Sequence, residues 1–314
     1  MGFIFFNYNK ESVNRAASSN KEIKELRRFG NERMDFVPPV MIQSLLPTDS
    51  ESFENALLLF LSDKFVSKTL MRVLSDYHFF GSSCHVDFLQ IDFNGRIRAV
   101  KEVDMNPHSG ETTGTRYRQN TLWSVYWAKK FHAGMSTSRT AKNDIGDFHR
   151  FRMVQCLFGE HLLNVERHPK NRNKSVGLVD DERDAVICSC AFPEMVWLAV
   201  GEKENAEDAE IMSVLKGRKV TSFPKRGEFY RWKSIADELA GKGVSINVSD
   251  VLERNISEER QKSLSIADYI LAQKSRNPDA ELVLEAMERK NPNIKILVDG
   301  LNLTPVSATV DRPA

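Results

Sequence analysis

The segment from Ser175 to Cys190, with sequence SVGLVDDERDAVICSC, constrains the fold of this chain more than any other. It opens with a short apolar run, Val176 to Val179, which is typical of a parallel strand buried on both faces. Three acidic residues follow directly, Asp180, Asp181 and Glu182, and a helical pattern begins there. Because open α/β sheets bind ligands at the carboxyl ends of their strands, these acids mark a candidate site.

The rest of the chain after residue 174 alternates apolar runs with helical patterns, which predicts parallel strands joined by right-handed crossovers. Strands are predicted at Val176–Val179, Met195–Val200, Lys219–Phe223 and Val244–Val248. Helices are predicted at Glu182–Cys190, Ala206–Leu215, Glu228–Ala240 and Asn277–Lys290. We therefore expect an α/β domain over residues 174–272 and a C-terminal helix with an extended tail over 273–314.

The preceding part has a different pattern, which predicts a smaller α+β domain over residues 48–165. Thr48 and Glu51 have the spacing of a capping box, and a second helix is expected from Asp63 to Tyr77. Two β-rich runs, His85–Phe93 and Arg96–Val103, flank Asn94-Gly95, a strong hairpin signal. Residues 1–47 are polar and are expected to form a solvated helix and a linker.

Composition limits the classes of protein to which the chain can belong. Its 314 residues and 41% apolar content suffice for packed cores, and two domains are expected. The four cysteines lack zinc-site spacing, and buried, reduced thiols predict a cytoplasmic protein. The longest apolar run, Ala56 to Leu61, is far too short to span a bilayer, so no membrane association is expected. With a net charge of +1, any binding of nucleic acid must come from local patches.

Two regions are candidates for such a patch. Arg116 and Arg118 precede an aromatic segment, predicted to be a strand, and arginines beside aromatic side chains can pair phosphates and stack bases. The alternative is a half-buried sheet with its arginines on the wet face. The second region, residues 129–174, is the most basic stretch of the chain. Its candidate residues for binding DNA or RNA include Lys129, Lys130, Arg150 and Arg152.

The acidic cluster after Val179 has two interpretations. Asp180, Asp181 and Glu182 are candidate catalytic residues, and Asp250 and Asp268, near later strand ends, could join Asp180 in binding Mg²⁺. Alternatively, acids at this position stabilise the N-terminus of the following helix through its macrodipole.

Several segments resemble an uncharacterised toprim-like family from bacterial plasmids and conjugative elements, which is related to the catalytic domains of primases. The resemblance is carried by Phe88–Arg98, Gln155–Leu163, Val176–Ala185, Val196–Gly201, Leu215–Val220, Phe223-Pro224 with Trp232, and Val248–Arg254 with Ala267–Tyr269. It implies a toprim-like, Rossmann-like parallel sheet, in which a glutamate ends the first strand and aspartates after a later strand hold Mg²⁺ for phosphoryl transfer.

This sequence departs from the family's pattern at both places. Asp180 stands where the family has glutamate, and Lys225, followed by Arg226, stands where it has a metal-binding aspartate. A cation at a metal position opposes metal binding, although Lys225 and Arg226 could bind a phosphate directly.

Three functions therefore remain open at this stage. The leading hypothesis is a primase-related protein of a mobile genetic element that binds nucleic acid and has a degenerate metal site. The second is an active Mg²⁺-dependent phosphotransferase or nuclease centred on Asp180. The third is a non-catalytic interaction partner in a replication or transfer complex.

Overall fold

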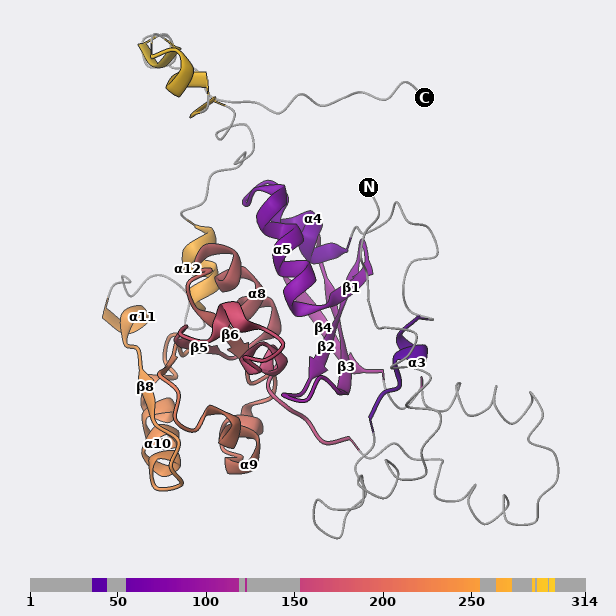
Figure 1. Ribbon diagram of the computed structural model, residues 1–314, viewed down its shortest axis with the longest axis vertical. Helices are drawn as coiled ribbons and strands as arrows, with labels where there is room; N and C mark the ends of the chain where they lie inside the picture. The colour runs from indigo at the N-terminus through magenta and orange to yellow at the C-terminus, as the bar shows by residue number, and fades with distance from the viewer. Residues whose placement is uncertain are drawn as a thin grey trace, which may run out of the picture.

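A computed structural model describes residues 36–43, 55–118, 122, 153–254 and 264–272, with short stretches at 284–285, 287–292 and 294–296. The described residues form a mixed α/β structure with an antiparallel and a parallel sheet, each of four strands. The two sheets lie side by side in the ribbon (Figure 1). The predicted capping box at Thr48, the aromatic segment after Arg118 and most of the C-terminal helix lie outside the described residues.

The antiparallel sheet is a meander in which the strands are ordered β1-β2-β3-β4. Its strands are β1 (Phe79–Ser82), β2 (His85–Ile91), β3 (Ile97–Met105) and β4 (Thr112–Tyr117). The predicted Asn94-Gly95 hairpin is confirmed between β2 and β3. Its turn is closed by Asp92, whose carbonyl accepts from the Gly95 amide at 2.8 Å and whose carboxylate accepts from the Asn94 amide at 3.0 Å. β4 was not predicted as a strand, because its residues are exposed threonines without an apolar alternation.

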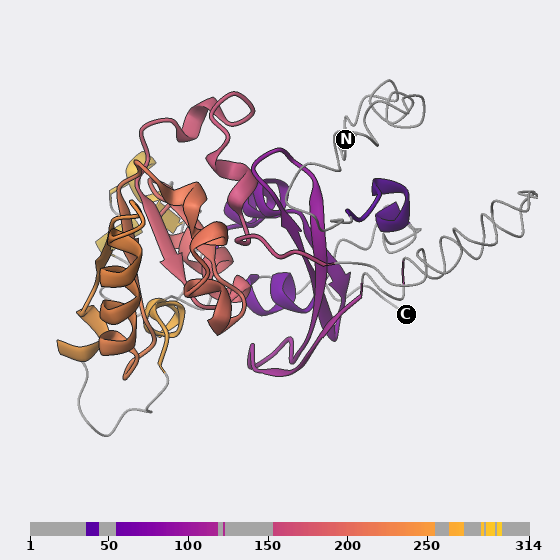
Figure 2. The same cartoon turned by 90° about the horizontal axis from the view of Figure 1, so that it is seen from below.

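Helices cover both faces of this sheet (Figure 2). α4 (Ala56–Leu61) and α5 (Ser67–Tyr77) pack with Phe79 and Phe88 on the face toward the parallel sheet. α3 (Pro39–Gln43) packs on the other face in a separate apolar cluster. The predicted second helix begins at Ser67 rather than Asp63, because residues 62–65 form a turn. α4 begins after Asn55, whose side chain accepts from the Leu58 amide at 3.0 Å.

The parallel sheet has the strand order β6-β5-β7-β8. Its strands β5 (Val176–Val179), β6 (Val196–Ala199), β7 (Val220–Ser222) and β8 (Ile246–Val248) confirm the four predicted strands: β5 has the predicted bounds, and no end of the others differs by more than two residues. All four residues of the central strand β5 and of the edge strand β6 are buried, as expected for parallel strands covered on both faces. β5 lies between β6 and β7, so the chain first adds a strand on one side of β5 and then adds the next on its other side.

The crossovers consist mainly of α8 (Glu182–Ala191) and α10 (Phe229–Ala240), close to the predicted bounds. α12 (Ile266–Leu271) packs on α8, and α11 (Val251–Arg254) follows β8. The predicted helix Ala206–Leu215 is wrong as a single helix: the chain forms two 3-10 turns, η3 (Lys203–Ala206) and η4 (Ser213–Leu215), around the short α9 (Ala209–Met212). The break arises because the Asp208 side chain accepts from the amides of residues 210 and 211 and starts a new helix.

The two sheets share one continuous apolar core. It contains Phe88 and Val103 of the antiparallel sheet together with Leu178, Trp197 and Leu198 of the parallel sheet. The Tyr77 hydroxyl, fully buried, donates to the Trp197 carbonyl at 2.8 Å and so joins α5 to β6. This shared packing holds the antiparallel sheet in a fixed position against the carboxyl edge of the parallel strands.

The structure also bears on the predicted burial of the cysteines and on the expectation that no segment spans a membrane. The four cysteines, all within the described residues, form no disulfide, and Cys156, Cys188 and Cys190 are buried as expected. Cys84 is exposed, so the expectation of burial is wrong for that residue, which lies in the turn between β1 and β2. Within the part of the chain that the structure describes, no helix has the length and apolar character needed to cross a bilayer.

Candidate functional site

A cleft of about 700 Å³ opens at the carboxyl edge of the parallel sheet, between that edge and strands β3 and β4. It lies where the strand order reverses, since Asp181 follows β5 and Lys225 follows the neighbouring strand β7. This is the position at which doubly wound sheets bind their ligands. The charged residues that line the cleft are Lys101, Glu111, Asp181, Glu182, Arg183, Asp184, Lys225 and Asp268.

Lys225 and Asp181 form an ion pair in the lining of the cleft, at the carboxyl edge of the parallel sheet. Their Nζ and Oδ2 atoms are 2.5 Å apart, and both side chains are partly exposed. Burial lowers the pKa of Lys225, but the carboxylate of Asp181 and the nearby Asp184 and Asp180 outweigh it and raise the pKa above the ordinary lysine value. Lys225 is therefore a fixed positive charge, and it neutralises the acid that lies nearest to it.

A second ion pair, between Lys101 and Glu182, is buried on the floor of the cleft. Lys101 projects from β3 across to the start of α8, where its Nζ lies 3.1 Å from Glu182 Oε2, and the two side chains are only 6% and 3% exposed. Glu202 adds a third charge, 3.4 Å from the same ammonium. Burial raises the pKa of Glu182, and the Lys101 ammonium counteracts that rise. This pair joins the two sheets electrostatically.

A third group of charges lies where α8 meets α12. Arg183 contacts Asp184 at 3.0 Å and Asp268 at 3.2 Å. Asp268 also closes a capping box with Ser265 at the start of α12, so its carboxylate has a structural role. Asp184 is buried, and this burial raises the pKa of its carboxyl to about 7.

The charges in the cleft are thus largely compensated within the protein. Each of the three cations that line it, Lys101, Arg183 and Lys225, is ion-paired with an acid. Acids outnumber cations in the lining. A polyanion would consequently gain little from entering this cleft.

The sequence-predicted site residues do not all meet here. Asp181 and Glu182 line the cleft, whereas Asp180 does not: its Oδ1 accepts from the Trp232 indole at 3.3 Å and so braces α10. Burial raises the pKa of Asp180. Asp250 pairs with Arg254 in the first turn of α11. The predicted metal group of Asp180, Asp250 and Asp268 is therefore wrong, because these carboxylates do not gather within 4.8 Å of one another.

These residues consequently do not fit Mg²⁺. The hard cation needs several oxygen ligands around one point, and Asp181, an acid of the cleft close to the end of β5, is occupied by the Lys225 ammonium. The alternative interpretation, stabilisation of the N-terminus of α8 by acidic residues, fits the positions of Glu182 and Asp184 in the first turn and of Asp181 just before it. Asp181 occupies the N-cap position of α8, but its side chain makes no capping hydrogen bond.

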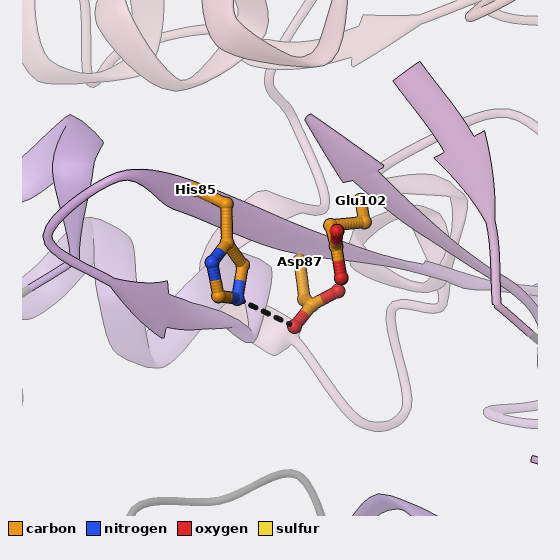
Figure 3. A group of neighbouring side chains, drawn as sticks. All are labelled: His85, Asp87 and Glu102. Carbon is orange, nitrogen blue, oxygen red and sulfur yellow. Dashed lines mark ion pairs between the residues drawn. The ribbon is translucent and has the colours of Figure 1, made fainter. Parts of the chain in front are cut away.

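One group in the described residues does bring three metal-ligand types together: His85, Asp87 and Glu102 (Figure 3). His85 Nε2 lies 3.6 Å from Asp87 Oδ2, and Asp87 faces Glu102 across β2 and β3. Arg118 occupies the same space, with its Nη1 2.9 Å from Asp87 and 2.7 Å from Glu102. The guanidinium thus provides the positive charge that a metal ion would otherwise supply.

This pairing also changes the interpretation of the arginines predicted to bind nucleic acid. Arg118 is held by two buried acids, and Arg116 pairs with Glu102 and Asp104. Their charges are therefore compensated, as in the alternative of a half-buried sheet. Lys129, Lys130, Arg150 and Arg152 lie outside the described residues. The half-buried Arg226 is in the turn after β7, where its amide donates to the Leu264 carbonyl at 3.0 Å.

Sequence reasoning missed Lys101 and Arg183 as residues of the cleft. Lys101 lies 81 positions from Glu182, in the other sheet, so no local pattern indicates their contact. The available signal was a charged pair, Lys101 and Glu102, between the apolar residues of the strand segment AVKEV, because a buried lysine requires a charged partner.

The fold and the site define a two-sheet α/β protein with a charge-compensated cleft at the switch point of its parallel sheet. The chain belongs to the family described as "Domain of unknown function (DUF6371)", which matches residues 55–226, more than half of its length. The matched region includes the antiparallel sheet and strands β5, β6 and β7. No curated protein and no solved structure matches the chain.

Proposed function

We propose that this protein is a toprim-like, primase-related nucleic-acid-binding protein of a mobile genetic element, with a degenerate metal site. The resemblance described above places an acid after the first strand of the parallel sheet and a second acidic position after a later strand. In the structure, the corresponding residues follow β5 and β7, which are hydrogen-bonded neighbours. The topology therefore supports the proposal by bringing both positions to one edge.

The observation that carries the proposal is the ion pair between Lys225 and Asp181. Lys225 occupies the position that the family resemblance gives to a metal-binding aspartate. Its ammonium supplies a permanent positive charge where a divalent cation would otherwise be needed to neutralise the acids. Because the Lys225 ammonium already neutralises an acid of this site, Mg²⁺ is not needed to do so. We therefore propose that the protein binds nucleic acid without transferring a phosphoryl group.

The proposed activity is binding in the cytoplasm to DNA or RNA, with replication or transfer proteins as further proposed partners. The basic region that begins at residue 129 ends, at residues 167–174, in the described part of the chain, where Arg167, Lys170 and Arg172 are exposed. Side chains of this kind contact phosphates irrespective of base sequence.

Fluorescence anisotropy with labelled single-stranded and double-stranded DNA tests this function directly. Each titration is made at several salt concentrations, first with Mg²⁺ and then with EDTA. We expect binding that weakens as salt rises, because phosphate contacts release counter-ions, and that is the same with EDTA. Binding that disappears in EDTA would contradict the degenerate site, and absence of binding to DNA and to an RNA of the same length would contradict the function.

A further inference from the structure

The opposite, amino-terminal edge of the parallel sheet carries positively charged side chains that form no ion pair within the described residues. Lys174 precedes β5, and Arg218 and Lys219 precede β7. Because Val176 pairs with Val220 in the parallel register, these residues lie at the same edge, and the Val176 amide donates to the Lys219 carbonyl at 2.9 Å.

Two further cations extend this edge on either side. Arg172 lies at the end of the 3-10 helix η2 (Pro169–Asn171). The Asn171 side chain donates to the Leu162 carbonyl at 3.0 Å, and Arg218 Nη2 donates to the adjacent Leu163 carbonyl at 3.0 Å, so η2 and Arg218 meet on one segment. On the other side, the Lys216 side chain approaches the turn at Gly243, just before β8. We call Arg172, Lys174, Lys216, Arg218 and Lys219 the amino-edge patch.

The bonding of these side chains distinguishes the amino-edge patch from the cleft. Within the described part of the chain, none of its five cations forms an ion pair, whereas every cation that lines the cleft does. Lys174 and Arg218 donate to neutral backbone carbonyls, which fix the side chains and leave their charges intact. Arg172, Lys216 and Lys219 are exposed.

The surroundings of Lys174 show that like charges are close together here. Burial lowers the pKa of Lys174, and repulsion from Lys170 and Arg72 lowers it further, while Asp76 and Glu194 act in the opposite direction. Asp76 is itself occupied by Lys170, at 2.7 Å. Of these two acids, Asp76 is therefore compensated, and Glu194 is left to offset the positive charge around Lys174.

We infer that the phosphate backbone of nucleic acid binds across the amino-edge patch and not in the cleft at the carboxyl edge. This inference rests on the proposed function, because it assumes that nucleic acid is the ligand. A group of cations that form no ion pair within the described residues attracts a polyanion, and each phosphate that they neutralise releases condensed counter-ions. The two edges of one sheet thus have different roles: the carboxyl edge retains a compensated, degenerate site, and the amino edge holds the ligand.

The test compares two triple variants of the full chain that change the net charge equally. The patch variant is Arg172→Gln/Lys216→Gln/Lys219→Gln; all three side chains are exposed and form no ion pair with the residues that the structure describes, so the fold should be retained. The control variant is Lys68→Gln/Lys233→Gln/Lys290→Gln, which removes three exposed lysines from α5, α10 and the C-terminal part. Circular dichroism checks both folds, and anisotropy with a labelled single-stranded and a duplex DNA measures affinity across salt.

We expect the patch variant to bind at least tenfold more weakly than the wild-type chain in low salt. Its slope of log K against log salt should fall by about 2 to 3, because each lost phosphate contact removes roughly 0.7 to 0.9. The control variant should keep the wild-type slope. If wild-type chain binds and the two variants bind equally well, the inference is overturned while the proposed function stands. If the wild-type chain binds neither these DNAs nor an RNA of the same length, both are overturned.

Discussion

Breaking the buried ion pair between Lys101 and Glu182 should cost more stability than breaking any surface pair. Its side chains are 6% and 3% exposed, so Lys101→Met would leave the Glu182 carboxylate buried without its partner. Removing one member of a buried pair costs about 3–5 kcal/mol. In guanidinium titrations we expect the free energy of unfolding to fall by that amount, with an unchanged m-value.

Two controls separate this effect from simple loss of a side chain. Lys203→Met removes the exposed partner of Glu228, and exposed pairs contribute less than about 1 kcal/mol. The double variant Lys101→Met/Glu182→Leu removes both charges and should recover most of the loss, because an apolar pair of similar volume tolerates burial.

The pH dependence of Lys101→Met provides an independent check. Burial raises the pKa of Glu182 in the folded chain, so the folded state of the variant takes up a proton more readily than the unfolded state. The deficit in stability should therefore be full at neutral pH and should shrink as pH falls toward the unfolded value of about 4.3. A single variant within about 1 kcal/mol of wild type, or a double variant no better than the single one, would refute the role of a buried charge.

Three further predictions concern other positions. Asp180→Ala should leave DNA affinity unchanged in anisotropy titrations, because the carboxylate braces Trp232 rather than lining the cleft; a tenfold loss would contradict that placement. Burial lowers the pKa of His161 to about 3, so its NMR ring signals should stay those of neutral imidazole as pH falls from 8 to 5. The free energy of unfolding should decrease as pH falls below about 6.5, the histidine pKa in the unfolded chain, because only the unfolded chain then binds the proton. An NMR titration midpoint near 6.5 would instead show an exposed ring. Gly159→Ala should destabilise the fold more than Gly217→Ala. Both residues have positive φ, so either substitution costs about 1–2 kcal/mol, but only at Gly159 would the new methyl group meet neighbours, with the Trp197 carbonyl oxygen at 2.9 Å. Equal losses of stability in thermal unfolding would argue against this packing.

The sequence predicted the local elements of the parallel sheet well because their signals are local. The buried run Val176–Val179 is β5 without correction, and the acids at its end begin α8 as expected. The helix around residue 209 was wrong because the capping side chain of Asp208 overrides the helical pattern there.

The arrangement of the site could be predicted only in part, because it depends on contacts between the sheets. That Asp181 and Lys225 meet depends on the pairing of β5 with β7, and the acid expected at this site was Asp180 rather than Asp181. That Lys101 reaches Glu182 depends on the packing of two sheets whose contacting residues are distant in sequence. The pairing of Arg118 with Asp87 likewise depends on the order of the strands in the antiparallel sheet, which no single segment specifies.

The central claim is that the Lys225 ammonium holds the place of a metal ion at the switch point. Isothermal calorimetry with Mg²⁺ on the wild-type chain and on Lys225→Asp tests it most directly. We predict no heat of binding for the wild-type chain at millimolar Mg²⁺, and measurable binding for the variant, in which a carboxylate joins Asp181. Stoichiometric binding of Mg²⁺ by the wild-type chain, with no gain in the variant, would contradict the claim.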